Sequence, residues 1–463
     1  MNHRIALFSR IPVVGAILLC GALCTAQIPT ASPPSEIDGS WFGTLDVGAA
    51  KLRLELKITT TAGLKASLVS LDQGNAEIPA TATRDGLAIK LEMKSIGGAL
   101  EGKFDKDFTR IDTTFTQNGA SFPLVLTRAK SEAAAPPPPR RPQYPVKPYP
   151  YKEEEVSYPN PAAGGIKFAA TLTIPPGKGP FPAVLLITGS GPQDRDETVM
   201  NQKPFLVLSD YLTRKGIAVL RADDRGVAKS EGTFATATTA DFATDAEAGL
   251  AYLKTRPEVD HHKMGLIGHS EGGTIAPMVA ARNKDVAFIV MLAGTTVPGY
   301  EIIVAQTAAL VKASGAPPEK VEAAAKQERA LLELVMHEKD NTVLRAKLKE
   351  QFAVPEGQLR ALTSPWYRYF LEYDPGPALR KVQCPVLALN GEKDVQVPPE
   401  LNLPALRKAL TEGGNKHFEA VEMPGMNHLF QVAKTGLPSE YETIEETMSP
   451  AVLEKVATWI GQQ

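Results

Sequence analysis

The chain has 463 residues, of which 43% are hydrophobic and 22% charged, and its formal net charge is −2. The hydrophobic fraction is that of a globular protein, and the length fits two or three domains, so general disorder is excluded. A near-neutral charge without a dense basic run argues against nucleic-acid binding through phosphate contacts, so we expect no nucleic-acid partner.

The first 26 residues have the pattern of a secretory signal peptide. Arg4 and Arg10 give a positive start, residues 11–23 are apolar, and small residues around Ala26 offer a cleavage point. The apolar run is shorter than the roughly 20 residues that a helix needs to span a bilayer, which disfavours an uncleaved anchor. We therefore expect an exported protein, periplasmic or secreted, with no stable membrane span once residues 1–26 are removed.

Residues 36–129 have β-strand character. Residues 51–58 alternate strictly between polar and apolar side chains, which predicts a strand with one wet and one buried face. Similar short runs follow at 64–71, 87–93, 111–116 and 122–127, separated by glycine-containing turns. We expect a small antiparallel all-β domain, a barrel or sandwich, that acts as a scaffold or positions substrate.

Residues 130–151 form a proline-rich linker, which favours a semi-rigid spacer, and residues 152–463 have a different pattern. Short apolar strands alternate with helical stretches, which predicts a doubly wound, mostly parallel α/β sheet. The expected strands are 166–174, 182–188, 216–221, 264–268, 286–292, 385–390 and 416–422. Residues 298–380 interrupt the alternation with helical stretches such as 319–338 and 342–352. They predict a helical cap over the carboxyl ends of the strands.

The strongest motif is the run Gly-His-Ser-Glu-Gly at 268–272. It lies between an apolar strand and a helix start rich in small residues, which is the context of a nucleophile elbow with Ser270 at its tip. A serine hydroxyl needs a base to take its proton. His428 follows the last expected strand and obeys the chain order serine, acid, histidine.

The acid of this site is expected after the penultimate strand, at Asp394, with Glu392 as the alternative. Its role would be to hold the imidazole in one tautomer and to stabilise the imidazolium. The oxyanion needs two donors, for which we expect the backbone N–H of Glu271 and that of Ser190, with Gly191 as the alternative to Ser190. The glycine-rich loop that holds the last two lacks the lysine and spacing of phosphate-binding loops.

These motifs resemble the α/β-hydrolase superfamily, and more narrowly the exported bacterial carboxylesterases of the EstD type, which join an N-terminal β domain to a capped hydrolase domain. The resemblance covers about residues 150–463 and implies that Ser270, Asp394 and His428 form the triad. Its motifs are GSGPQDRD at 189–196, RADDRG at 221–226, GHSEGG at 268–273, SPWYRYF at 364–370, GEKD at 391–394 and NHLFQ at 427–431. Thr188 and Ala228 depart from it, because relatives commonly have His and Gly there.

Two further groups of residues lie near the expected site. Trp366, Tyr369 and Phe370 could line an acyl pocket, although packing of the cap against the core is an equally good interpretation. Residues 223–225 (Asp-Asp-Arg) follow a strand end, and we expect them to form structural ion pairs rather than to act as catalysts.

The sequence therefore predicts a serine hydrolase that cleaves small carboxylic esters through an acyl-enzyme on Ser270. No cofactor or metal is implied, since no clustered His and Cys ligands appear. A peptidase of the aminopeptidase or prolyl-peptidase kind and an acyl thioesterase are alternatives on the same triad, and a non-catalytic envelope binding protein is a distant one. The acyl chain length and the oligomeric state stay open.

Overall fold

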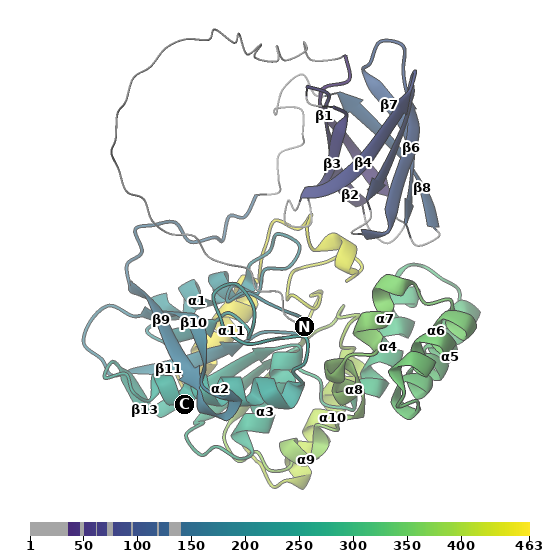
Figure 1. The fold of residues 1–463 in the computed structure, drawn as a ribbon. Helices are drawn as coiled ribbons and strands as arrows, with labels where there is room; N and C mark the ends of the chain where they lie inside the picture. The colour runs from purple at the N-terminus through teal and green to yellow at the C-terminus, as the bar shows by residue number, and fades with distance from the viewer. Residues whose placement is uncertain are drawn as a thin grey trace, which may run out of the picture.

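The computed structural model describes residues 36–46, 51–61, 63–71, 77–93, 96–117, 120–128 and 140–463. The expected signal peptide and residues 130–139 of the expected linker lie outside the described residues. Figure 1 shows a β-barrel near the N-terminus and a larger α/β domain that holds the C-terminus.

The N-terminal strands form a closed barrel, which confirms the expected antiparallel all-β domain. Each strand pairs with its neighbour in the chain, and β1 closes the barrel by pairing with β8. The strands are β1 (Gly39–Asp46), β2 (Lys51–Thr59), β3 (Lys65–Ser70), β4 (Glu77–Asp85), β5 (Ala88–Met93), β6 (Gly98–Phe104), β7 (Arg110–Gln117) and β8 (Ala120–Arg128).

The sequence did not predict β1, β4 and β6, and glycine explains two of the misses. Glycine normally weakens a strand pattern, but β1 and β6 need it where neighbouring strands approach closely. A Cβ at Gly43 would lie 2.3 Å from the carbonyl oxygen of Val125, and one at Gly102 would lie 2.3 Å from that of Asp112. The third strand, β4, carries no buried side chain and so lacks the apolar alternation that would reveal it.

The second sheet is doubly wound and mostly parallel, as expected, with strand order β16-β15-β14-β13-β11-β12-β10-β9. The neighbours from β12 to β16 run parallel, whereas β10 pairs antiparallel with both β9 and β12. The strands are β9 (Lys152–Asn160), β10 (Ile166–Ile174), β11 (Phe181–Ile187), β12 (Ala218–Ala222), β13 (Val259–His269), β14 (Phe288–Leu292), β15 (Val386–Gly391) and β16 (Phe418–Met423). The sequence missed only the charged edge strand β9.

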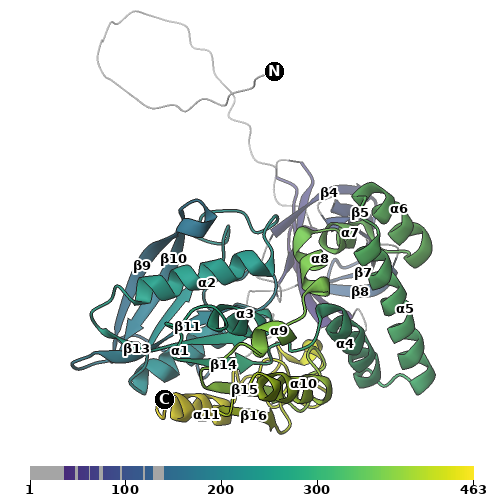
Figure 2. The same cartoon turned by 90° about the horizontal axis from the view of Figure 1, so that it is seen from below.

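Helices cover both faces of this sheet (Figure 2). Buried side chains of α2 (Thr239–Leu253), α3 (Glu271–Ala280) and α10 (Pro399–Glu412) pack on one face, and those of α1 (Pro204–Arg214) and α11 (Pro450–Ile460) pack on the other. Strands covered on both faces become continuously apolar, which is why the sequence revealed them.

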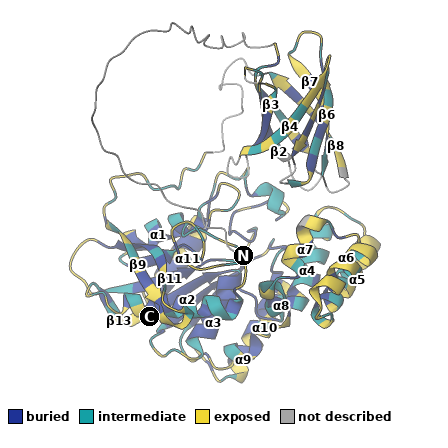
Figure 3. Cartoon of the chain, in the orientation of Figure 1, coloured by how far each residue is buried: buried dark blue, intermediate teal, exposed yellow. Residues whose placement is uncertain are grey.

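The helical insertion lies between β14 and β15. It consists of α4 (Gly299–Ala313), α5 (Pro318–His337), α6 (Asn341–Phe352), α7 (Glu356–Leu362) and α8 (Pro365–Glu372), and the short α9 (Gly376–Leu379) leads back to the sheet. Leu332, Val335, Leu344 and Leu348 are fully buried among these helices and give them a core of their own. Figure 3 shows the contrast between the buried sheet with α3 and the exposed outer faces of α5 and α6. Within the described residues, no helix combines the length and the apolar character needed to cross a bilayer.

The barrel core offers a direct test of its contribution to stability. Trp41 is fully buried, contacts Phe104 edge-on at 5.2 Å between ring centroids, and donates from Nε1 to the carbonyl oxygen of Ile37 at 3.1 Å. We expect Trp41→Ala to lower the free energy of unfolding of the barrel by about 3–5 kcal/mol, because it leaves a cavity and an unpaired acceptor. Denaturant unfolding followed by circular dichroism measures the loss. Val125→Ala, at an exposed position on β8, serves as the control, and equal effects of the two substitutions would contradict the prediction.

Candidate active site

Ser270 lies at a sharp turn between β13 and α3, with φ 52° and ψ −117°. A non-glycine residue with positive φ is strained, and such strain is typical of functional sites. The flanking glycines make the turn possible. A Cβ at Gly268 would lie 2.0 Å from the carbonyl oxygen of Gly272, and one at Gly272 would lie 2.1 Å from that of Ile187. Glycine is therefore required two residues before and two residues after Ser270, because the backbone nearby leaves no room for a side chain there.

The structure brings Asp394 and His428 together. Asp394 follows β15, and its Oδ2 lies 2.8 Å from Nδ1 of His428, while its Oδ1 accepts from the backbone N–H groups of Gln396 and Val397, each at 2.9 Å. Both side chains of the pair are buried, which strengthens their attraction. The alternative acid, Glu392, is exposed and accepts from the backbone N–H of Gly425 instead.

Ser270 and His428 line the same cavity, which has a volume of about 340 Å³. Asp394 holds Nδ1 of His428, so Nε2 is the ring nitrogen left to act as a base. In the described part of the chain, the Ser270 hydroxyl makes no hydrogen bond, and such contacts often tighten only when substrate binds. No group of three or more His, Cys, Asp or Glu side chains among the described residues is arranged to hold a metal ion.

The two expected oxyanion donors also lie at this cavity, since Glu271 and Ser190 both line it. Glu271 is the first residue of α3, where a backbone N–H has no acceptor within the helix. Within the described residues, neither this N–H nor that of Ser190 has a hydrogen-bond acceptor. Gly191, the alternative to Ser190, lines a second, smaller cavity behind the loop instead.

The carboxyl group of Glu271 is buried and connects three helices. Its Oε1 accepts from the Thr239 hydroxyl of α2 at 2.7 Å and from the Trp366 indole N–H of α8 at 2.8 Å. Burial raises the pKa of Glu271, although these donors oppose that effect. The carboxyl thereby fixes Trp366 on the wall of the cavity.

Two of the three expected pocket aromatics line the cavity, and the third does not. Trp366 and Phe370 lie there, stacked at 5.6 Å between ring centroids. Tyr369 is absent from the lining and stacks on Tyr373 at 5.7 Å. Residues four apart share a helix face, so α8 presents 366 and 370 on one face, and 369 and 373 on the next. The structure therefore places Tyr369 outside this cavity.

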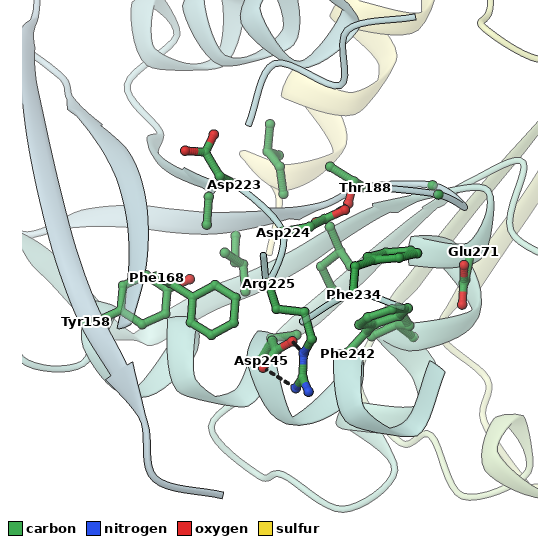
Figure 4. Close-up of a pocket in the computed structure, with 18 residues that line it drawn as sticks. Tyr158, Phe168, Thr188, Asp223, Asp224, Arg225, Phe234, Phe242, Asp245 and Glu271 are labelled. Carbon is green, nitrogen blue, oxygen red and sulfur yellow. Dashed lines mark hydrogen bonds and ion pairs between the residues drawn. The ribbon is translucent and has the colours of Figure 1, made fainter. Parts of the chain in front are cut away.

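Two of the three residues at 223–225 form the expected ion pairs. Asp223 pairs with Arg195 at 2.8 Å. Arg225 pairs with Asp245 at 2.7 Å, as Figure 4 shows. Both pairs are largely buried and join β12 to neighbouring segments of the α/β domain. They contribute structure around residues 188–193, which hold the expected donor Ser190 and are called the oxyanion loop below, without lining the cavity that holds Ser270.

Asp224 differs from the expectation, because it binds two uncharged donors in place of a cation. Its Oδ1 accepts from the Thr188 hydroxyl at 2.8 Å and its Oδ2 from the Gln193 backbone N–H at 2.9 Å. It lines the small cavity of about 50 Å³ drawn in Figure 4, beside Thr188. Burial raises the pKa of Asp224 to about 8. Asp224 therefore ties together both ends of the oxyanion loop, and Thr188 contributes to this bracing.

Glu197 and His269 are residues of this site whose part the sequence did not reveal. Both line the cavity, and Oε1 of Glu197 lies 2.9 Å from Nδ1 of His269. His269 directly precedes Ser270 in the elbow motif, and Glu197 lies in a loop without periodic pattern. The sequence offers one indication of a role for Glu197, which is that it directly follows the glycine-rich run at 189–196.

Comparison with protein families agrees with this architecture. The family model described as X-Pro dipeptidyl-peptidase (S15 family) matches residues 164–412, more than half of the chain. The chain belongs to the S15 family. The match includes Ser270 and Asp394 and ends before His428. Membership places the chain among hydrolases, in agreement with the expected superfamily.

Individual relatives of this S15 member include an esterase. Esterase EstD of Thermotoga maritima is 27% identical over 290 residues, 62% of this chain and 64% of that protein, so the chain spans less than two thirds of the esterase. An uncharacterized 31.7 kDa protein of Escherichia coli is 26% identical over 218 residues, 46% of this chain and 75% of that protein. A solved esterase of Pyrococcus furiosus matches with a TM-score of 0.42 and 14% identity, over 70% of this chain and 96% of that one.

The raised pKa of Asp224 predicts a pH dependence of stability. Asp224 holds a proton in the folded protein that it releases near pH 4 when unfolded, so its contribution is full below that pH and is lost as the pH rises towards 8. Asp224→Asn mimics the protonated acid, since its amide can donate to the Thr188 hydroxyl and its carbonyl can accept from the Gln193 N–H. We expect the melting temperature of the variant to fall less than that of the wild type between pH 5 and pH 9.

The neighbouring Asp223 provides the control for this measurement. Although Asp223 is buried, Arg195 lowers its pKa, so Asp223 is already ionised across that range in both states. Asp223→Asn should therefore shift the melting curve by the same amount at pH 5 and at pH 9. If the melting temperature of Asp224→Asn fell with pH as steeply as that of the wild type, the assignment of this proton to Asp224 would be contradicted.

Proposed function

We propose that the protein is a serine hydrolase that cleaves carboxylic esters through an acyl-enzyme on Ser270. The observation that carries the proposal is the buried Asp394–His428 hydrogen bond at the same cavity as a serine on a strained elbow. Nε2 of His428 would take the serine proton as the hydroxyl oxygen attacks the carbonyl carbon. It would then protonate the leaving alkoxide and activate the water that releases the acid.

The backbone N–H groups of Glu271 and Ser190 would stabilise the tetrahedral oxyanion. They favour the transition state because fixed donors in a site that excludes water need no reorganisation as charge develops. Both are without an acceptor among the described residues. No existing hydrogen bond of these two N–H groups therefore has to break when the oxyanion forms.

The S15 family description makes an exopeptidase the second candidate, and the cavity disfavours it. Such an enzyme needs a negative group to hold the ammonium terminus of its substrate. The two carboxyl groups that line the cavity already accept from the protein: Glu271 from Thr239 and Trp366, and Glu197 from Gly189 and His269. The second oxygen of Glu197 has no hydrogen-bond partner among the described residues, but it is buried and therefore inaccessible to a substrate ammonium group. These contacts favour an uncharged ester or thioester.

The size and lining of the cavity favour a small acyl group. Its volume of about 340 Å³ is at the lower end of the range for small-molecule sites. Trp366, Phe370, Ile302 and Leu429 supply apolar wall. Short and medium acyl chains would fit without movement of the cap.

We further propose that the protein is exported and that the barrel acts as an accessory module. The charge and apolar pattern of residues 1–26 supports export. The barrel contacts the other domain through Arg53, whose Nη2 lies 3.6 Å from Oε1 of Glu442. Glu442 follows Tyr441, which lines the active-site cavity, so this contact supports a role for the barrel near the entrance for substrate.

The triad predicts steep losses of activity. Ser270→Ala should lower kcat on p-nitrophenyl esters by about 10⁴-fold or more, and Asp394→Asn by about 10⁴-fold, because the base then lacks its nucleophile or its correct tautomer. A p-nitrophenyl ester series and matched p-nitroanilides, assayed on each protein, measure these losses and separate the candidates. Activity that persists in Ser270→Ala would sink the proposal, and anilides cleaved faster than esters would favour the peptidase.

The cavity wall predicts a change in acyl preference. Phe370→Ala removes a ring from the lining, so kcat/KM for octanoyl relative to butyryl esters should rise several-fold, since each buried methylene contributes about 0.8 kcal/mol. Tyr369→Ala removes a ring of similar size from the same helix but outside the cavity, and it should leave the ratio unchanged. Equal shifts in both variants would show that α8 acts through cap packing alone.

A further inference from the structure

A continuous set of buried hydrogen bonds runs along the wall of the cavity. Oε1 of Glu197 accepts from the backbone N–H of Gly189 at 2.7 Å and lies 2.9 Å from Nδ1 of His269. The other ring nitrogen of His269, Nε2, lies 3.0 Å from the backbone carbonyl oxygen of His428. The side chains of Glu197 and His269 are 3% and 7% exposed, so water does not compete for these contacts.

We propose that Glu197 and His269 are positioning residues for the hydrolysis described above, on which this inference rests. Together they join the oxyanion loop, the elbow and the loop of the catalytic histidine, which come from three distant parts of the chain. Although both side chains lie on the cavity wall, the role proposed for them is positioning rather than binding of substrate. Their effect would be to hold the oxyanion donor and the His428 backbone at fixed positions relative to Ser270.

The packing around Gly189 shows that the hydrogen bonds of Glu197 lie next to Ser270. A Cβ at Gly189 would lie 3.2 Å from Oε1 of Glu197 and 3.2 Å from the Ser270 side chain. The backbone of the oxyanion loop is thus held between the Glu197 carboxylate and the nucleophile. A displacement of about 1 Å in such a site can lower the rate by about 10²-fold.

The acceptors around His269 determine its protonation. A carbonyl oxygen cannot donate, so Nε2 must carry a proton to bond His428, and Nδ1 faces a carboxylate. One proton is therefore shared between Nδ1 and Glu197, and only the imidazolium form donates on both sides. Burial would lower the pKa of His269, but Glu197 and the His428 carbonyl raise it above its usual value, with Asp394 adding to the effect.

Features of Glu197 itself argue against a purely stabilising role. Its backbone has φ 54°, a strained conformation for a non-glycine residue, and its buried Oε2 has no hydrogen-bond partner in the part of the chain that the structure describes. Each feature costs stability, on the order of 1–3 kcal/mol. Such costs are typical of residues that are placed for function.

Glu197→Gln tests the role with little change in shape. The glutamine carbonyl can still accept from the Gly189 N–H, but it no longer supplies the charge that stabilises the imidazolium. A neutral His269 has a single N–H, so it can then donate to either residue 197 or the His428 carbonyl, not to both. We expect kcat on the preferred p-nitrophenyl ester to fall at least about tenfold, with KM changed less than about threefold, because positioning acts on the transition state.

A matched control breaks a charge pair away from the site. Glu154 on β9 pairs with Arg256 at 2.8 Å and lines no part of the active-site cavity, so Glu154→Gln should leave kcat unchanged. Melting temperatures of both variants separate a loss of folded protein from a loss of positioning. A kcat of folded Glu197→Gln within threefold of the wild type would overturn the inference.

Nitrogen-15 spectra of labelled histidine give a readout that needs no substrate. His269 should show two protonated ring nitrogens near pH 7 in the wild type and one in Glu197→Gln, with its signals assigned by their loss in His269→Gln. A singly protonated ring in the wild type would also overturn the inference. Loss of the ester assignment itself would appear separately, as wild-type activity that survives Ser270→Ala.

Discussion

The strained backbone of Ser270 is the constraint on which the rest of the site depends. A serine at φ 52° is stable only if its surroundings determine its conformation, and here they do so from both sides. Its backbone N–H donates to the carbonyl oxygen of Leu292 on β14, and its own carbonyl accepts from the N–H of Gly273. Gly273 in turn packs on Gly294, and a Cβ at Gly273 would lie 2.5 Å from the Cα of Gly294. The elbow is therefore held by backbone contacts that any larger side chain would break.

Rigid strands deliver the other groups to this point, and buried acids join the loops between them. Asp394 holds both His428 and the start of its own loop, Asp224 holds both ends of the oxyanion loop, and Glu197 connects that loop to His269. Each carboxyl thus has at least two donors from different backbone segments or side chains. A buried carboxyl that lost one donor would still be desolvated and would lack compensation. Displacement of one loop should therefore destabilise the loops that share its carboxyl.

The sequence predicted what depends on local pattern and missed what depends on contacts across the fold. Strands of the parallel sheet are buried on both faces and so appear as apolar runs, and the glycine spacing around Ser270 reflects a local steric requirement. Asp224 was mistaken for an ion-pairing residue because nothing in its neighbourhood along the chain shows that Asp223 takes the arginine. Tyr369 was placed in the pocket because helix α8 has aromatics on two adjacent faces, and only the tertiary structure shows which one meets the cavity. For Glu197, the partner lies 72 residues away along the chain, beyond any periodic signal.

The arrangement also explains why the α/β domain needs so large a core. Strain at Ser270 and Glu197, together with buried carboxyls at Asp224 and Glu271, opposes folding by several kcal/mol in sum. Two hydrophobic clusters, one on each face of the sheet, surround the strands that end at the site and offset that cost. The buried side chains of the barrel form a separate core. Because stability comes from the sheet while the chemistry lies on the loops beyond its carboxyl edge, the loops can keep conformations that would not be stable on their own.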